Sequence, residues 1–215
     1  MLILGELFIE YVKQYRSIWI TGRLGGGKTA LATYIAYVLA KEGYKIISNI
    51  RIDGAIRLPK PEDFSRAVVI LDEAADFLDA YEFRNELLAA FKYLRHFDLV
   101  CLFPCADKIH SRLRKLIVER VFRLEALLPL PFPIWIYRYW IGPGSFSRAT
   151  SIYSYFAFIP TPRLFKSYDS THGGRGVTTL HVMKAMREAI VVPSDNILDK
   201  ELILASEDIS YGSVD

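Results

Sequence analysis

The eight residues from Gly22 to Thr29 constrain the fold of this chain more than any other segment. They read Gly-Arg-Leu-Gly-Gly-Gly-Lys-Thr and fit the pattern G-x-x-x-x-G-K-[ST]. The apolar run Ser17–Thr21 comes before them, and Lys28–Lys41 follows with apolar residues at helical spacing and Gly43 just beyond. The order of strand, glycine-rich turn and helix is the context that this pattern needs to be a phosphate-binding loop.

The residue types in this loop indicate how it would hold a nucleotide. Lys28 would place its charge on the β- and γ-phosphates, and Thr29 would offer its hydroxyl to Mg²⁺. Glycines allow the backbone to curl, so that successive N–H groups and the helix N-terminus face the phosphates. An Asn-Lys-x-Asp element for reading guanine is missing from the sequence, which favours ATP. The predicted ligands are ATP and Mg²⁺, with the phosphates on Gly22, Gly25, Gly26 and Gly27.

A second element ends in two acids. Residues 68–71 form an apolar run that reads as a strand, and it would deliver Asp72 to the sheet edge beside the first strand, where the metal would lie. Asp72 would support Mg²⁺ directly or through water. Glu73 follows it and would orient and deprotonate a water for in-line attack on the γ-phosphate, which predicts an ATP hydrolase. The alternative is that both acids only cap the following helix.

Apolar runs and helical patterns alternate through the first part of the chain. Strands are predicted at 45–50, 67–71 and 99–105, and helices at 81–96 and 108–119. Runs that are apolar throughout are typical of parallel strands covered on both faces. The pattern predicts an α/β fold, a RecA-like P-loop NTPase core over residues 1–125 with a parallel sheet flanked by helices.

The pattern changes beyond Arg120. Residues 121–124, 134–141 and 152–159 read as strands separated by Pro and Gly. Residues 171–177 read as a loop, 178–190 as an amphipathic helix, and 195 onward as an acidic tail. Residues 126–215 are therefore predicted to be a small β-rich and helical C-terminal extension packed on the core.

Composition and cysteine content limit the partners and the cellular compartment that this chain can have. The formal net charge of +3 is small for 215 residues, so any contact with DNA must be local. Cys101 and Cys105 lie four residues apart in one predicted strand, about 13 Å between their Cα atoms, which is too far for a disulfide. No signal peptide is visible at Met1–Glu10, and the apolar stretch 126–137 is short and holds three prolines. We expect a cytoplasmic protein without a transmembrane span, although that stretch could lie on a membrane or a partner.

A basic segment follows the predicted strand at 99–105. It contains Arg112 and Arg114, with Arg120 close behind. One of these could act as an arginine finger on the γ-phosphate of a neighbouring subunit, since a fixed guanidinium offsets charge in the transition state. The same stretch could contact DNA phosphates or be a solvated helix face. The finger role would require an oligomer, for which a homo-oligomeric ring is predicted.

These motifs together resemble the zonula occludens toxin (Zot)-like ATPases of the FtsK–HerA class of DNA-pumping motors. The resemblance covers residues 15–125. Besides the phosphate loop it rests on Leu71-Asp72-Glu73-Ala74, Arg95-His96, the segment 108–114 and the segment 165–170. It departs at Phe103-Pro104-Cys105, where that class often has a polar sensor of the γ-phosphate, and no membrane span follows the core.

The resemblance implies a Mg-dependent ATPase motor that acts on double-stranded or single-stranded DNA in viral packaging or in virion assembly and extrusion, with a capsid or membrane partner. One alternative is a phage assembly ATPase that is peripheral at the membrane through Leu127–Trp140. Another is a nucleotide-gated scaffold with little turnover, which the missing sensor would suit. A small-molecule kinase is disfavoured, because Glu73 follows Asp72 directly and no lid motif is found.

Overall fold

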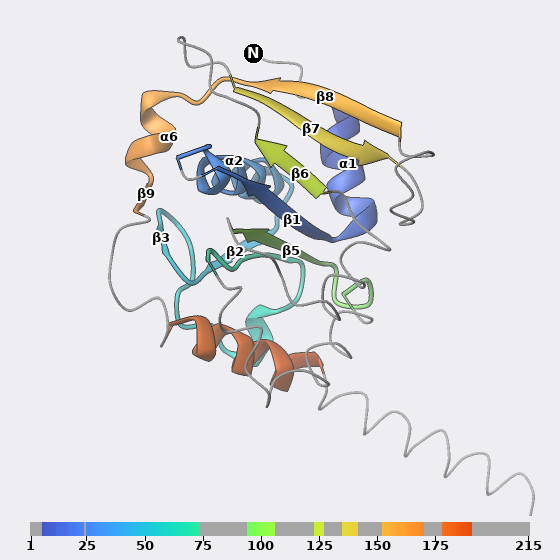
Figure 1. Ribbon diagram of the computed structural model, residues 1–215. Helices are drawn as coiled ribbons and strands as arrows, with labels where there is room; N and C mark the ends of the chain where they lie inside the picture. The colour runs from blue at the N-terminus through green and yellow to red at the C-terminus, as the bar shows by residue number, and fades with distance from the viewer. Residues whose placement is uncertain are drawn as a thin grey trace, which may run out of the picture.

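A seven-stranded sheet with the strand order β2-β4-β5-β1-β6-β7-β8 runs through the molecule (Figure 1). The structure is a computed structural model, and it describes residues 6–23, 25–73, 94–105, 123–126, 135–141, 152–169 and 178–190. The strands of this sheet are β1 (Ser17–Gly22), β2 (Lys45–Ser48), β4 (Ala67–Ile70), β5 (Leu99–Pro104), β6 (Arg123–Ala126), β7 (Trp135–Ile141) and β8 (Ile152–Phe158).

Strands β2, β4, β5, β1 and β6 are parallel, and β4 and β5 are buried along their whole length. The predicted α/β fold with a parallel sheet flanked by helices is confirmed, and the arrangement is consistent with a RecA-like core. One expectation about the order of the strands was wrong. The strand that ends before Asp72 does not lie beside β1, because β5 is inserted between β4 and β1. Short apolar strands of equal character carry no signal for their order, so the sequence could not reveal this insertion.

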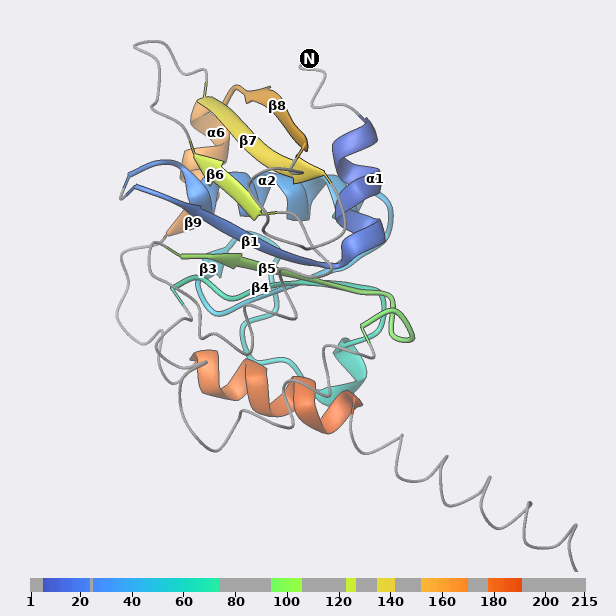
Figure 2. The ribbon, with the colours of Figure 1, turned by 45° about the vertical axis from the view of Figure 1, so that its right-hand side comes forward.

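Helices cover both faces of the sheet. On one face lie α1 (Glu6–Tyr15) and α2 (Lys28–Lys41), and on the other lies the helix of residues 178–190, drawn in orange-red (Figure 2). The first face buries Phe8 and Val12 of α1 with Leu31 and Ile35 of α2. The second face buries Met186 with several other apolar residues of its helix. Two apolar layers therefore sandwich the parallel strands, as such strands require.

Helix α2 begins and ends where its sequence indicates. Gly27 is its N-cap and has a left-handed φ of 74°. At the other end the N–H of Gly43 donates to the carbonyl oxygen of Ala40 and that of Tyr44 to Leu39, with Gly43 at φ 92°. Glycine adopts this conformation without steric cost, which explains the stop. The helix thus returns from the carboxyl edge of the sheet and packs along β1, β4 and β5.

The strands that follow residue 126 continue the same sheet. Strand β7 pairs antiparallel with β6, and β8 pairs antiparallel with β7. The helix predicted at 178–190 is present, while α1, the short helix α6 (Pro162–Lys166) and a two-stranded sheet of β3 (Arg51–Ile52) and β9 (Tyr168–Asp169) were not predicted. The division into 1–125 and 126–215 stays a prediction, and its two parts share one sheet.

Several predicted segments lie wholly or partly outside the described residues. These are most of the helix at 81–96, the basic helix at 108–119, the loop at 171–177 and the acidic tail. The described residues 94–98 form a turn.

Cys101 and Cys105 are both buried, and they do not form a disulfide, as expected. The 3-10 turn Pro61–Asp63 leads from β3 toward β4.

Candidate nucleotide-binding site

The predicted phosphate loop lies between the end of β1 and the start of α2. Gly25 and Gly27 have φ angles of 73° and 74°, which an L side chain rarely adopts. The N–H of Gly26 donates to the carbonyl oxygen of Arg23 at 2.9 Å and tightens the turn. The first N–H groups of α2 have no carbonyl one turn back within the helix, so this curled backbone offers donors to an anion.

Lys28 stands at the first position of α2 and is only 6% exposed. Its Nζ donates to the carbonyl oxygens of Arg23 at 3.1 Å and of Gly22 at 3.4 Å. The side chain therefore folds back along the inside of the loop, toward the atoms that would surround the phosphates. A buried ammonium needs oxygen partners, and here the loop itself supplies them.

Thr29 and Asp72 meet although they come from different strands. The Thr29 hydroxyl donates to Oδ1 of Asp72 at 2.9 Å, and Asp72 is 2% exposed. Asp72 stands two residues beyond β4, and Thr29 follows β1, so the contact crosses the carboxyl edge above β5. The hydroxyl and the carboxylate are hard oxygen ligands of the kind that Mg²⁺ prefers. With two protein ligands, a Mg²⁺ here would take its others from phosphates and water, as this ion commonly does.

Asn49 holds the backbone of Asp72 in place, a role that the sequence did not predict. Its Nδ2 donates to the Asp72 carbonyl oxygen at 2.8 Å, while its Oδ1 accepts the Asp72 N–H at 2.8 Å. The same Nδ2 donates to the Thr179 hydroxyl at 2.8 Å, from the helix of residues 178–190. Asn49 and Thr179 are fully buried. The one available signal is a lone Asn directly after an apolar strand, which is too common to single out.

Glu73 has a φ of 49°, in the left-handed region that a glutamate rarely occupies. Its N–H donates to the carbonyl oxygen of Pro104 at 2.9 Å, which ties the residue to the end of β5. Non-glycine residues held in this region are found preferentially at functional sites, because the surrounding structure must hold them there. The position of Glu73, next to Asp72 at the edge of the sheet, fits the predicted base.

Tyr168 of β9 lies close enough to respond to Asp72. Burial, and after it the negative charge of Asp72, raise the pKa of Tyr168 above its ordinary value. Strand β9 belongs to the small sheet with β3, so a segment late in the chain comes near Asp72. From the sequence, Tyr168 was named only as part of the segment 165–170, on which the family resemblance partly rests, and no role was predicted for it.

The position where a polar sensor was looked for is apolar and buried. Phe103 and Cys105 are each 1% exposed, and the Trp19 indole N–H donates to Sγ of Cys105 at 3.2 Å. The N–H of Cys105 donates to the carbonyl oxygen of Ile20, next to the loop. This end of β5 therefore supports β1 through packing and through the Cys105 backbone bond, which continues the parallel pairing of the two strands. Arg112 and Arg114 lie outside the described residues, and their roles stay predictions.

Comparisons with known proteins add one structural similarity. The sequence matches no known family and no curated protein. Among solved structures, the chain is similar to the N-terminal domain of zonular occludens toxin from Neisseria meningitidis. The TM-score is 0.47 at 15% sequence identity, over 72% of this chain and 98% of that chain. A similarity of this size assigns no function, so the proposal below rests on the residues of the site.

Proposed function

We propose that the protein binds ATP with Mg²⁺ at the carboxyl edge of β1, β5 and β4 and hydrolyses it. The hydrogen bond between Thr29 and Asp72 carries this proposal. It joins the two segments that were predicted from separate motifs, and it places a hydroxyl and a carboxylate together beside a glycine-rich loop at a helix N-terminus. A chance glycine turn would have no reason to meet a buried acid from another strand.

Each residue has a physical role in this reaction. The loop N–H groups and Lys28 hold the phosphates, while Thr29 and Asp72 hold the metal, which when bound would offset the negative charge of the phosphates. Glu73 orients a water and accepts its proton during in-line attack on the γ-phosphate. The predicted cofactor and site residues are thus all retained in the proposal.

Steady-state ATP hydrolysis by the purified chain tests the proposal, alongside Glu73→Gln. We expect Mg-dependent turnover in the wild type and a loss of about 10²- to 10⁴-fold in the variant, since that is the usual contribution of a positioned base. ATP binding should be kept in Glu73→Gln, because the substitution leaves the loop, Lys28, Thr29 and Asp72 unchanged. Binding without turnover in the wild type would contradict hydrolysis and leave the nucleotide-gated scaffold.

The finer part of the proposal is that the ATPase is a motor for viral DNA packaging or virion assembly. It is supported by the sequence resemblance described above. Double-stranded or single-stranded DNA would then raise the rate of hydrolysis. An unchanged rate with either form of DNA would remove the motor from the proposal without affecting ATP hydrolysis.

The proposed motor would act as a ring in which Arg112 or Arg114 reaches the nucleotide of the neighbouring subunit. Mixing Arg112→Ala/Arg114→Ala chains with Lys28→Ala chains tests this. A finger that acts across the interface predicts partial recovery of turnover in the mixture, since some interfaces regain both groups. No recovery, with an intact oligomer, would exclude the exchange of groups between subunits.

A second candidate function is attachment to a membrane surface, favoured by what we call the α6 patch: Ile159, Arg163, Phe165 and Lys166. Phe165 and Ile159 are large apolar side chains that remain 44% and 40% exposed. A groove of about 880 Å³ adjoins the patch, and among the described residues that line it the basic ones are Lys41, Arg163 and Lys166 against one carboxylate, Asp53. Exposed apolar and basic side chains together suit an anionic lipid surface.

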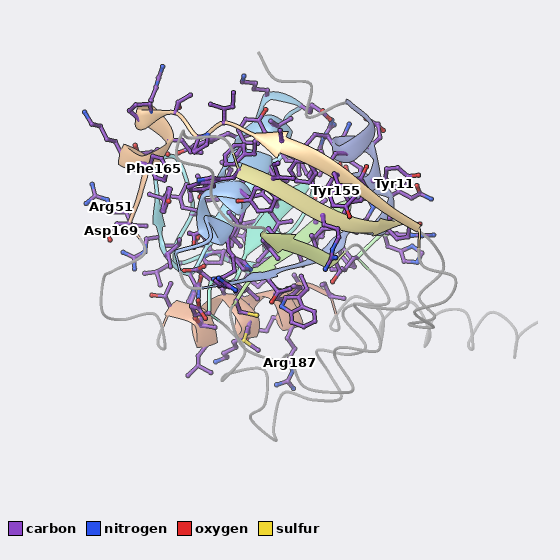
Figure 3. All side chains as sticks on the ribbon, turned by 45° about the horizontal axis from the view of Figure 1, so that its top comes forward. Tyr11, Arg51, Tyr155, Phe165, Asp169 and Arg187 are labelled. Atoms are coloured by element: carbon purple, nitrogen blue, oxygen red, sulfur yellow. The ribbon has the colours of Figure 1, made fainter. Side chains whose placement is uncertain are left out.

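This candidate differs from the prediction that used Leu127–Trp140, most of which lies outside the described residues. Within the described part of the chain, the helices lack the length and apolar character needed to cross a bilayer. Flotation with anionic vesicles tests the patch through Arg163→Glu/Lys166→Glu. Lys184→Glu/Arg187→Glu changes the net charge equally, and Figure 3 shows Arg187 on a different side of the molecule from Phe165. Loss of flotation in Arg163→Glu/Lys166→Glu alone would support membrane attachment through the α6 patch. Equal flotation of the two variants would exclude attachment through this patch.

A further inference from the structure

Strand β7 contacts the phosphate loop directly, although it lies more than a hundred residues away in sequence. The hydroxyl of Tyr137 lies 3.1 Å from the carbonyl oxygen of Gly27 and 3.4 Å from that of Gly26. Tyr137 is fully buried, and its burial raises the pKa of the hydroxyl far above its ordinary value. The hydroxyl therefore keeps its proton at any physiological pH and acts as the donor.

This contact helps to fix which way two peptide groups of the loop face. The Gly27 carbonyl oxygen also accepts the N–H of Leu31 at 2.9 Å, so the start of α2 and Tyr137 hold that peptide together, while Tyr137 reaches the Gly26 carbonyl as well. In a planar trans peptide the C=O and the N–H point in opposite directions. A donor on the carbonyls of Gly26 and Gly27 therefore holds the N–H groups of Gly27 and Lys28 on the side away from β7. A hydrogen bond at the carbonyl also polarises the peptide group and strengthens its N–H as a donor. Successive N–H groups that converge in this way form an anion-binding concavity.

Trp135 supports the same segment by packing. A Cβ built on Gly27 would lie 1.8 Å from Cζ3 of the Trp135 indole, so the ring occupies the space beside the Gly27 Cα. The ring is held in turn by edge-to-face contacts with Phe158 at 5.9 Å and Phe165 at 5.7 Å between centroids. Tyr137 is stacked on Phe156 at 5.2 Å. Side chains of β8 and α6 thus hold both residues in place.

We propose that Tyr137 and Trp135 are positioning residues of the nucleotide site, which brace the Gly26–Lys28 segment so that its N–H groups face the phosphates. This rests on the proposed binding of ATP at the loop. Its consequence is that residues after 126 are part of the nucleotide site, because without β7 the loop loses a hydrogen-bond donor and a packing surface.

Tyr137→Phe tests the brace, since it removes one hydroxyl and keeps the ring. Tyr139→Phe is the matched control, because Tyr139 lies on the same buried face of β7 two residues further along. The Kd for Mg-ATP and the steady-state constants of both variants are measured. We expect the Kd and KM of Tyr137→Phe to rise about 5- to 10-fold, the usual effect of one hydrogen bond, with kcat nearly unchanged. A purely structural loss would lower the active fraction and therefore kcat.

Amide hydrogen exchange in the protein without nucleotide separates this inference from the proposed function. The peptide that spans Gly22–Thr29 should exchange several-fold faster in Tyr137→Phe than in the wild type or in Tyr139→Phe. Failure of the wild type to bind ATP would overturn the proposed function and leave the exchange result to decide the brace. Equal exchange and equal Kd in the two variants would overturn the brace while the proposed function stands.

Discussion

The parallel and the antiparallel halves of the sheet contribute differently to the candidate site. The parallel strands β1 and β4 deliver the chemical groups to one edge, Lys28 and Thr29 after β1 and Asp72 and Glu73 after β4. The antiparallel strands β7 and β8 deliver no such group among their described side chains, but β7 contacts the back of the phosphate loop. The chemical groups come directly after a strand, so a local sequence motif can reveal them. The residues that support these groups come from distant segments, which only the fold brings near.

Gly27→Ala should have the largest effect on stability, because it disrupts the contact between the phosphate loop and Trp135 of β7, where the two halves of the sheet meet. The new methyl group would meet the Trp135 ring and would also be held at φ 74°. Left-handed strain and overpacking together predict a loss of about 4 kcal/mol in the free energy of unfolding without nucleotide, measured by denaturant titration.

Gly54→Ala is the control for that substitution. Gly54 has a φ of 78°, and a Cβ there would meet nothing within 4 Å. Gly54→Ala introduces the backbone strain without a steric clash, so its free energy of unfolding should fall by only about 1 kcal/mol. If Gly27→Ala and Gly54→Ala lose the same free energy of unfolding, Trp135 does not pack closely against the loop. The claim that the antiparallel half supports the phosphate loop would then be wrong.

Asn49→Ala should come next, since it removes support from within the parallel half. The substitution removes the three hydrogen bonds that Asn49 makes, with the N–H and the carbonyl oxygen of Asp72 and with the Thr179 hydroxyl. We expect a loss of about 2 to 4 kcal/mol in the free energy of unfolding. Thr179→Val removes one of the three hydrogen bonds and should lose about 1 kcal/mol. Chemical denaturation measures both, and an equal loss would show that Asn49 does not hold Asp72.

Asp98→Asn should have the smallest effect, because Asp98 lies in the turn before β5, at the opposite end of that strand from the site. Partial burial pushes the pKa of Asp98 upward, but hydrogen bonds from Arg16 and Tyr44 outweigh it and hold the pKa below its usual value. The ionised form therefore stabilises the fold above the unfolded pKa of about 4, and this contribution is lost as the pH falls through the folded pKa.

Thermal unfolding as a function of pH measures that contribution. The difference in Tm between wild type and Asp98→Asn should be constant from about pH 8 to 5 and should narrow as the pH falls below about 4. It should vanish only below the lowered folded pKa of Asp98, where both side chains are neutral. Binding of ATP should be the same in both proteins. A difference that widens toward low pH would contradict the lowered pKa of Asp98.

The sequence predicted the α/β class, the helix at Lys28–Lys41 and most strands, because glycine punctuation and apolar runs act locally. It also predicted Thr29 and Asp72 as ligands of one metal ion; their side chains are hydrogen-bonded to each other, and the metal roles stay predictions. It did not predict the insertion of β5 between β1 and β4, since strand order depends on packing between elements of similar composition. Asn49 and Tyr137 were missed for the same reason, because each acts on a backbone far away in sequence.

Calorimetric titration with ATP tests the central claim most directly, namely that this loop binds a nucleotide with Mg²⁺. The wild type, the wild type in excess EDTA and Lys28→Ala are compared at equal protein concentration. The account predicts binding by the wild type with Mg²⁺, at least tenfold weaker binding in EDTA, and at least a hundredfold loss in Lys28→Ala, since a buried charge-assisted contact to phosphate would be removed. Equal affinity in all three titrations would contradict a nucleotide site at Gly22–Thr29.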